Sequence, residues 1–265
     1  MTAAVAMIGP RATLVQFAGW LSAHAPISTG RRTRARSAQP VLGNLPPARS
    51  VLAITSRPGK ESVDLGGLLH AFRTSGARVA LLCMTRGEAS GLNSTSQRLE
   101  VLRPSELQLA AGLLGVSSLA VADYPDGELG RYPTLELTER VQRAITEHAP
   151  DLILVVDPAV GDADDAEVAC AACLAAESAG LPVAARTWPG ARSGWRVGLG
   201  SEAAAARAVQ RSAAAAYASQ ADGLPEVHRR LNRLGHEEQL RWLQAPKLGP
   251  DAPVLVPRPR VPVAS

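Results

Sequence analysis

Short apolar runs alternate with amphipathic, helix-like segments along most of this chain, and no other feature constrains its fold as strongly. The runs are SVLAITS (50–56), ARVALLCMT (77–85), SSLAVADYP (117–125), DLILVVDP (151–158) and LPVAARTW (181–188). Runs of this length and composition are typical of strands buried on both faces of a parallel sheet. The alternation predicts right-handed βαβ units. We therefore expect an α/β, Rossmann-like three-layer domain with a mostly parallel sheet.

The segments between these runs have helical periodicity, and another helical segment follows the last run. We predict helices over 64–76, 103–115, 135–150, 164–179 and 201–220. The segment WRVGLG (195–200) resembles a short edge strand, and residues 223–244 resemble a terminal helical hairpin.

The composition divides the chain into three parts. Residues 1–47 are rich in Ala, Pro and Arg and lack sustained periodicity, which predicts a poorly ordered arm. Residues 48–245 are expected to form the α/β domain, and residues 246–265 a Pro-rich tail. The arm contains five Arg and no acidic residue. Since the net charge of the whole chain is +4, residues 48–265 have a net charge of −1. We expect no nucleic-acid partner beyond weak contacts of this basic arm, for which a solvated tail is the alternative.

The cellular location is predicted from membrane, export and cysteine signals. No apolar stretch has the length of a membrane span, so no membrane contact is expected. The segment ATLVQFAGWLSAHA (12–25) only loosely imitates a signal peptide. Cys83, Cys170 and Cys173 give an odd count without a disulfide pattern, which favours a reducing compartment. The Cys170–Cys173 pair lies inside an Ala-rich helical segment, where buried thiols are commoner than redox pairs. We predict a cytoplasmic protein.

In an open parallel sheet, ligands bind beyond the carboxyl ends of the strands. The loops to inspect are therefore 56–62, 86–92, 124–129 and 158–165, and they carry ordered motifs. These are Arg57-Pro58-Gly59-Lys60-Glu61 with Gly66-Gly67, then Thr85-Arg86-Gly87-Glu88, then Arg103, Glu106 and Leu107 before Leu114-Gly115, then Pro125-Asp126-Gly127, Asp162-Ala163-Asp164-Asp165 and Tyr217-Ala218-Ser219-Gln220.

Over roughly residues 50–222 the order and spacing of these motifs resemble the LmbE/PIG-L de-N-acetylase family. That family uses Zn²⁺. The resemblance implies that Arg57, Lys60 and Asp165 stand at the positions of its three zinc ligands. It places Gly59 where the family has its general base, and Asp162 where a histidine faces the reacting carbonyl. Arg and Lys have no lone pair to offer at neutral pH, and zinc needs about three donors. We therefore expect no metal, no cofactor and no zinc-dependent amide hydrolysis.

The substituted residues have opposite charges on facing loops. Arg57 and Lys60 are in the first loop, whereas Asp162 and Asp165 are in the last. One hypothesis is an ion-pair cluster in the place of the metal, in which case Arg57→Ala should destabilise the fold markedly. The alternative is a set of ordinary solvated loop charges.

Other positions have weaker predicted roles. The resemblance implies that Arg103 and Asp126 reach hydroxyls of a bound sugar, whereas a helix-end residue and a turn former are the plainer interpretations. Glu61 and Asp164 are weak candidates for acid–base catalysis. The favoured function is a degenerate deacetylase-like protein that binds an acetylated amino sugar or related metabolite, or supports a partner enzyme. The alternative is an active amidohydrolase with a metal on Glu61 and the 162–165 aspartates. The sequence does not predict an oligomeric state.

Overall fold

The computed structural model describes residues 42–91, 98–188, 194–232 and 234–246. Most of the predicted arm and tail, the loop residues 92–97 and residues 189–193 lie outside the described residues. The described chain forms an eight-stranded sheet in the order β1-β7-β8-β6-β5-β2-β3-β4. The bounds of the strands are β1 Leu42–Gly43, β2 Ser50–Thr55, β3 Arg78–Thr85, β4 Ser118–Tyr124, β5 Leu152–Val156, β6 Val183–Thr187, β7 Trp195–Gly198 and β8 Glu237–Gln244.

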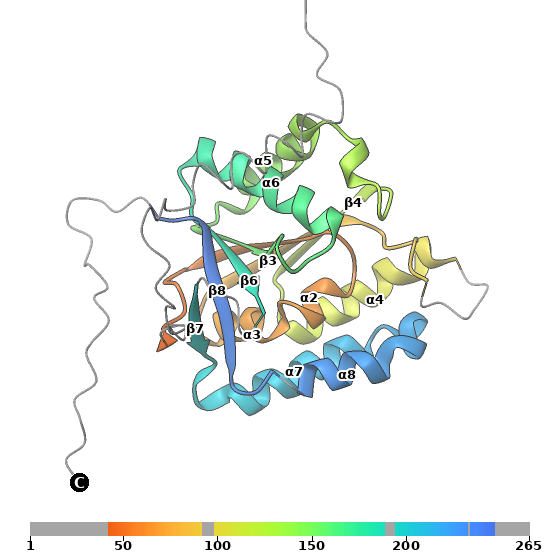
Figure 1. The fold of residues 1–265 in the computed structure, drawn as a ribbon, viewed down its shortest axis with the longest axis vertical. Coiled ribbons are helices and arrows are strands. Elements are labelled where there is room, and N and C mark those ends of the chain that lie inside the picture. Colours follow the sequence, from red (N-terminus) through yellow and green to blue (C-terminus); the bar gives the residue numbers. More distant parts are fainter. Residues whose placement is uncertain (1–41, 92–97, 189–193, 233, 247–265) are drawn as a thin grey trace, which may run out of the picture.

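The five strands β2 to β6 pair only in parallel with one another, as the alternating pattern predicts. Helices cover both faces of this sheet, which gives the expected three layers (Figure 1). The helices are α2 Lys60–Val63, α3 Gly66–Thr74, α4 Leu99–Leu114, α5 Thr134–His148, α6 Ala163–Ala179, α7 Ala203–Ala215 and α8 Leu224–Asn232.

Two apolar cores lie between these layers, one on each face of the sheet. The core beneath α5 and α6 contains Leu52, Ile54 and Val155 with the small side chains of α6. The other contains Leu68 and Leu107 from α3 and α4, packed on the opposite faces of the same strands. Because successive residues of a strand point to opposite faces, strands with apolar residues at every position fill both cores.

The C-terminal region differs from the predicted helical hairpin. Only α8 is helical, and residues 237–244 form β8, which pairs antiparallel with both β6 and β7. A turn at Gly235, with a φ of 57°, separates the two elements. The prediction was wrong because the helix-like spacing of Leu240 and Leu243 was judged without knowing that β6 and β7 leave a gap in the sheet between them.

Two further boundaries differ from the predictions. Leu42 and Gly43, which we assigned to the arm, form β1 and pair with β7, so β1 rather than β7 is the edge of the sheet. The helix predicted to begin at Arg103 begins at Leu99, and Pro104 lies inside its second turn. Pro is tolerated near a helix start because the N–H groups there have no partner within the helix.

Candidate functional site

The four loops named from the sequence meet at the carboxyl edge of β2, β3, β4 and β5. The first of them turns through Gly59, which has a φ of 98° and begins the short helix α2. The last ends at Asp162, the N-cap of α6. Asp162 accepts a hydrogen bond from Asp165 N (3.1 Å), and Asp165 accepts one from Asp162 N (3.0 Å). This reciprocal capping box fixes both carboxylates at the start of the helix.

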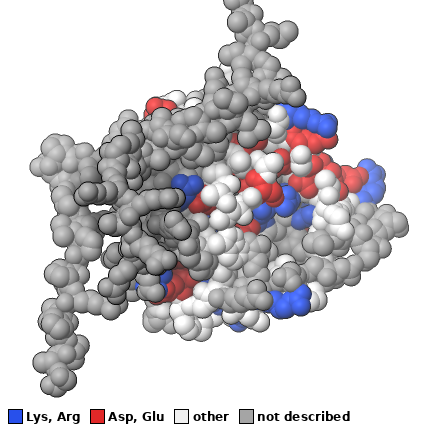
Figure 2. Space-filling view, viewed as in Figure 1, with Lys and Arg blue, Asp and Glu red and all other residues white. Residues whose placement is uncertain are grey.

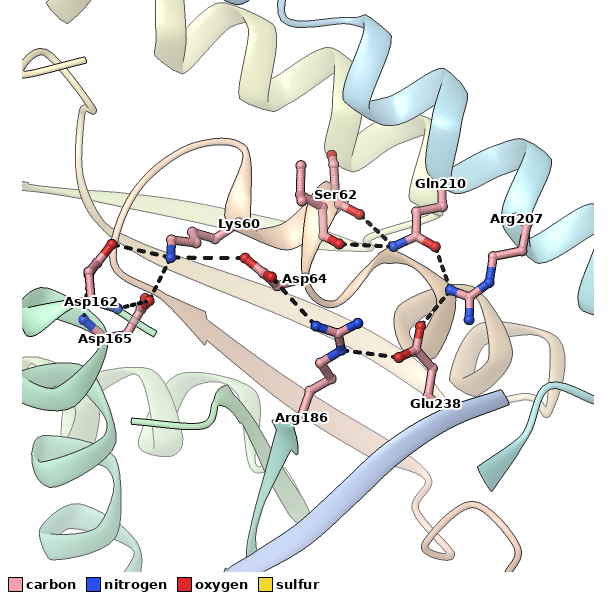
Figure 3. A network of polar contacts seen from close by, with 10 residues as sticks. Lys60, Ser62, Asp64, Asp162, Asp165, Arg186, Arg207, Gln210 and Glu238 are labelled. Atoms are coloured by element: carbon pink, nitrogen blue, oxygen red, sulfur yellow. Dashed lines mark hydrogen bonds and ion pairs between the residues drawn. The ribbon is translucent and has the colours of Figure 1, made fainter. Parts of the chain in front are cut away.

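The ammonium of Lys60 lies between three carboxylates (Figure 3). Its Nζ is 2.6 Å from Asp165 Oδ2, 3.2 Å from Asp162 Oδ2 and 3.9 Å from Asp64 Oδ2. Arg57 adds a second cation, with Nη2 2.7 Å from Asp162 Oδ2. Of the two alternatives that the sequence left open, the ion-pair cluster is therefore the one that is formed. Its centre is Lys60, since the Lys60 side chain is 15% exposed and that of Arg57 34%.

Opposite charges decide the pKa values in this cluster. Burial by itself lowers the pKa of Lys60, but Asp165 and Asp64 outweigh it and the pKa is raised above its usual value. Burial likewise favours a higher pKa for Asp162, yet Lys60 and Arg57 hold this pKa below its usual value. The charged forms of Lys60 and Asp162 are therefore favoured by their neighbours.

The cluster continues into the protein interior as a chain of alternating charges (Figure 3). Asp64 Oδ1 lies 3.6 Å from Arg186 Nη1, and Arg186 Nε lies 3.0 Å from Glu238 Oε2. The second oxygen of Glu238 pairs with Arg207 of α7. Arg186, on β6, is fully buried and also lies over the ring of Trp188, with Cζ 4.1 Å from the ring centroid. The site loop is thus tied through ion pairs to β6, β8 and α7.

The Gly66–Gly67 pair makes room for this chain of charges. A Cβ on Gly67 would lie 2.6 Å from Arg207 Nη1 and 3.1 Å from Glu238 Oε1, and a Cβ on Gly66 would lie 2.8 Å from Gln210 Cγ. Gln210 in turn donates to the carbonyls of Ser62 and Val63. The two glycines therefore permit α3 to approach the polar side of α7 closely.

Glu61 lies in a separate cluster made of neutral donors. Its carboxylate is fully buried and accepts hydrogen bonds from Gly59 N (2.8 Å), Ser62 Oγ (2.6 Å) and Tyr217 Oη (2.8 Å). Burial raises the pKa of Glu61 above its usual value, and these hydrogen bonds only partly oppose the shift. Tyr217, near the end of the segment that resembles the family, thus helps to hold the first loop in place through Glu61.

Asp164 holds the loop that follows β4. Its two oxygens accept hydrogen bonds from Gly127 N (2.8 Å) and Leu129 N (3.1 Å), and the residue is only 3% exposed. Burial raises its pKa, with these two bonds acting in the opposite direction. Because both oxygens already bind backbone donors, Asp164 has a structural part in fixing the loop.

Arg103 and Asp126 come together at the same edge but are mostly buried. Arg103 donates from Nη1 to the Gly87 carbonyl (3.0 Å) and from Nη2 to the Pro58 carbonyl, so it joins the first and second loops. Arg103 lies in the second turn of α4 and not at its end, contrary to the plainer interpretation of the sequence. Asp126 is 7% exposed, and burial raises its pKa even though Arg57 and Arg103 oppose the shift.

The donor set at this edge does not fit zinc. Two of the positions implied by the resemblance carry cations, and Lys60 Nζ already makes the contacts with Asp165 and Asp162. The alternative set is also unsuited, since the oxygens of Glu61, Asp164 and Asp165 bind separate protein donors. Among the described residues, no three His, Cys, Asp or Glu side chains are grouped so that they could hold a metal ion.

The inner half of the network, formed by Arg186, Glu238 and Arg207, was not predicted from the sequence. Arg186 could have been noticed because a charged residue interrupts an otherwise apolar strand run, and such a residue is buried only with a partner. The Asp162–Asp165 spacing directly before a helix also signals a capping box. Nothing in the sequence indicated that Glu238 and Arg207 would be the partners.

The cysteines have no feature of a redox pair. Burial raises the pKa of Cys170 to about 11 and that of Cys173 to about 12. Both thiols are therefore protonated at neutral pH, as expected for packing residues within α6. Separately, no helix in the described part of the chain is long and apolar enough to cross a membrane.

The basic and acidic side chains that are visible on one face of the molecule lie interspersed (Figure 2). Residues 48–265 together have a net charge of only −1. The mixed pattern gives this face no single-sign field.

Comparison with known proteins finds a family model that matches the first part of the domain. Residues 52–176 match the PIG-L model, described as GlcNAc-PI de-N-acetylase. No curated protein matches the chain in sequence.

Several solved structures share the fold. The N,N'-diacetylchitobiose deacetylase of Pyrococcus horikoshii is 19% identical with a TM-score of 0.62, over 74% of this chain and 84% of that one. A conserved protein of Thermus thermophilus is 22% identical with a TM-score of 0.60, over 80% and 99%. The 4-carboxy-2-hydroxymuconate hydratase of Pseudomonas putida is 17% identical with a TM-score of 0.61, over 76% and 98%. Residues 52–176 of the α/β domain thus match the PIG-L family model, and the solved structures share the fold of the domain.

Proposed function

We propose that this protein is a PIG-L domain that works without a metal and binds a hydroxyl-rich small molecule, of the class of acetylated amino sugars, at the carboxyl edge of the sheet. The observation that carries the proposal is the position of Lys60, whose ammonium contacts the capping carboxylates Asp162 and Asp165. A fixed cation in that place opposes the binding of a second one.

The residues at this edge are also poorly suited to amide hydrolysis. An amide hydrolase needs an activated water and donors for the developing oxyanion. Gly59, at the position of the family's base, has no side chain, and its φ of 98° would strain an aspartate there. Asp162 would bring a negative charge toward the oxyanion. The arrangement therefore favours binding over turnover.

The partly exposed side chains at the carboxyl edge of the sheet include both hydrogen-bond donors and acceptors. Arg57 and Asp162 have side chains about a third exposed, at 34% and 35%, and Asp126 lies close enough to Arg57 to influence its pKa. A neutral polyol satisfies such a mixed set better than an ion, because it donates and accepts at neighbouring hydroxyls. Arg103 supports the two loops from beneath rather than presenting its Nη groups to a ligand.

Metal content is the first test. Purified protein incubated with Zn²⁺ is expected to retain less than about a tenth of an equivalent by elemental analysis, and to leave N-acetylglucosamine intact. The matched variant Arg57→His with Lys60→Asp and Asp165→His supplies three zinc donors at these positions and is expected to retain close to one equivalent. Stoichiometric zinc in the unmodified protein would overturn the proposal.

Ligand binding is tested separately by calorimetry with N-acetylglucosamine and, for comparison, glucosamine. Heat of binding to the unmodified protein that is lost in Asp126→Asn supports the polyol site. Asp123, an exposed aspartate near the end of β4, provides the control variant Asp123→Asn. Absence of binding up to millimolar sugar would refute this part of the proposal.

A further inference from the structure

Strand β4 forms one end of the sheet, and within the described residues no strand lies beside its outer side. On its inner side β4 pairs in parallel with β3, with Ser118 opposite Ala80. Most of its side chains are only half-buried, whereas those of β2 and β5 are buried throughout. The N–H and C=O groups along such an edge can pair with a further strand, and native proteins usually cover or interrupt it.

Two recesses follow this edge of the sheet on the side of α4. One has a volume of about 430 Å³ and is lined by Pro104, Ser105, Gln108, Leu119 and Val121. The other has a volume of about 310 Å³ and is lined by Arg86, Glu100, Val101, Pro104, Val121 and Asp123. Because Pro104 and Val121 line both, the recesses adjoin one another along β4. A strand added beside β4 would place alternate side chains in them.

The sequence that follows β8 contains a segment suited to the edge of a sheet. Residues 253–261 are PVLVPRPRV, in which Pro253, Pro257 and Pro259 are all at odd-numbered positions. Since successive residues of a strand direct their N–H groups to opposite sides, the prolines remove N–H groups from one side only. The other side keeps those of Val254, Val256, Arg258 and Arg260. Proline is accepted in an edge strand when its N–H side faces solvent.

We propose that residues 253–261 add to the sheet as a strand parallel to β4, on its outer side. The direction follows from the reach of the chain. Gln244, the last residue of β8, lies opposite Val183, the first residue of β6, so β8 ends at the edge where the parallel strands begin. A strand beyond β4 is six positions from β8 in the sheet, or about 29 Å at about 4.8 Å each.

The ten residues from Gln244 to Val254 span up to about 33 Å when extended, which is enough to cross that distance. An antiparallel strand would have to begin at the opposite edge, farther away by the length of β4. Residues 245–253 cannot cover both distances, so the parallel direction is favoured.

The parallel arrangement also places the prolines over the recesses. In β5, Ile153 faces the core beneath α5 and α6, and its N–H donates to the Pro182 carbonyl at the start of β6, away from β4. Parallel strands of one sheet share this relation between the side-chain face and the direction of the N–H group. In a strand outside β4, residues whose N–H points to β4 therefore face α5. Those whose N–H points away face α4, where Leu255 and the prolines meet Pro104 and Leu119.

A segment of the same chain is favoured over a separate molecule at this edge. A tethered segment that can reach its site has an effective concentration there of about millimolar. A second copy of the chain at micromolar concentration competes poorly with it. The added strand would also protect the edge of the sheet from pairing with other chains.

Hydrogen–deuterium exchange of the full chain, followed in peptides that contain residues 118–124, tests the proposal. Alternate N–H groups of β4 point outward, and they are protected only when a strand covers them. We expect slow exchange at both sets of β4 amides in the unmodified protein. Val256→Pro removes an N–H that faces β4, and exchange of about half of the β4 amides should become faster by about tenfold or more.

Leu255→Pro is the matched control, because residue 255 directs its N–H away from β4, as the prolines at 253, 257 and 259 do. This variant should keep the slow exchange. Rapid exchange of the outward amides in the unmodified protein would overturn the proposal, and so would equal effects of the two variants. Protection that persists in Val256→Pro and increases with protein concentration would also overturn it, and would identify a second copy as the partner of β4.

Discussion

Lys60 and Glu61 are neighbours in the short helix α2, yet their surroundings favour the charged form of one and the uncharged form of the other. Lys60 lies among Asp64, Asp162 and Asp165 and has a raised pKa, so its charged form is favoured. Glu61 has only neutral partners and its pKa is also raised, but for a carboxyl group that shift favours the uncharged form.

The difference shows what each residue contributes to the site loop. The Lys60 cluster joins the loop to α6 through ion pairs. Removing one member leaves a buried charge without its partner. The Glu61 cluster fixes the loop to Tyr217 by hydrogen bonds that a neutral group can also make. The first cluster depends on charge, and the second on geometry.

The largest effect is expected from Lys60→Met. Removing the ammonium leaves Asp165, which is 1% exposed, without its cation. We expect the free energy of unfolding to fall by about 3 to 5 kcal/mol in urea denaturation.

Lys60→Met combined with Asp165→Asn should recover part of that loss, because the uncompensated buried charge is also removed. A double mutant whose loss equals the sum of the two single losses would contradict the ion-pair account.

An intermediate effect is expected from Glu61→Gln, and it should depend on pH. A carboxyl group whose folded pKa is raised stabilises the fold below its unfolded pKa, and this stabilisation is lost as the pH rises through the folded pKa. Near pH 4 the free energy of unfolding of the variant should be lower by about 1 kcal/mol, because the amide makes less favourable hydrogen bonds than the carboxyl group. As the pH rises, the deficit should shrink or reverse.

Urea denaturation of both proteins between pH 4 and pH 9 measures this trend. Glu139→Gln, at an exposed position of α5, is the control and should show no such trend. A deficit that stays constant across the range would mean that Glu61 does not titrate as its burial implies.

The acid limb of the stability curve should reflect the Lys60 cluster. The folded pKa of Asp162 is below its usual value, so its contribution is present above the unfolded pKa of about 3.8 and is lost as the pH falls through the folded value. Asp162→Asn should therefore flatten part of the loss of stability below about pH 4. An identical acid limb in both proteins would exclude this contribution.

The smallest effect is expected from Arg57→Ala, although the ion-pair hypothesis drawn from the sequence implied a marked loss. The Arg57 and Asp162 side chains are each about a third exposed, at 34% and 35%, so solvent screens the pair. We expect a change of about 1 kcal/mol or less in the free energy of unfolding. A loss as large as that of Lys60→Met would show that the two cations act as one unit.

Local patterns predicted the central strands and the facing loops well, because each apolar run and its flanking turn contain their own signal. Helix α6 illustrates this, since its Ala-rich sequence predicts a helix over 164–179 and the helix is Ala163–Ala179. Strand β8 is the opposite case. Its residues favour a helix or a strand about equally, and only pairing with β6 and β7 decides between them.

Residue types and short spacings along the chain were enough to predict the α/β fold class, the resemblance to the PIG-L family, and the opposite charges on the first and last loops. Three-dimensional packing, in contrast, made Lys60 rather than Arg57 the central cation. It also set Glu61 apart from the aspartates and extended the network through Arg186 and Glu238 to β8. Burial and partner choice across more than 50 residues of sequence depend on how the layers pack, which no local pattern specifies.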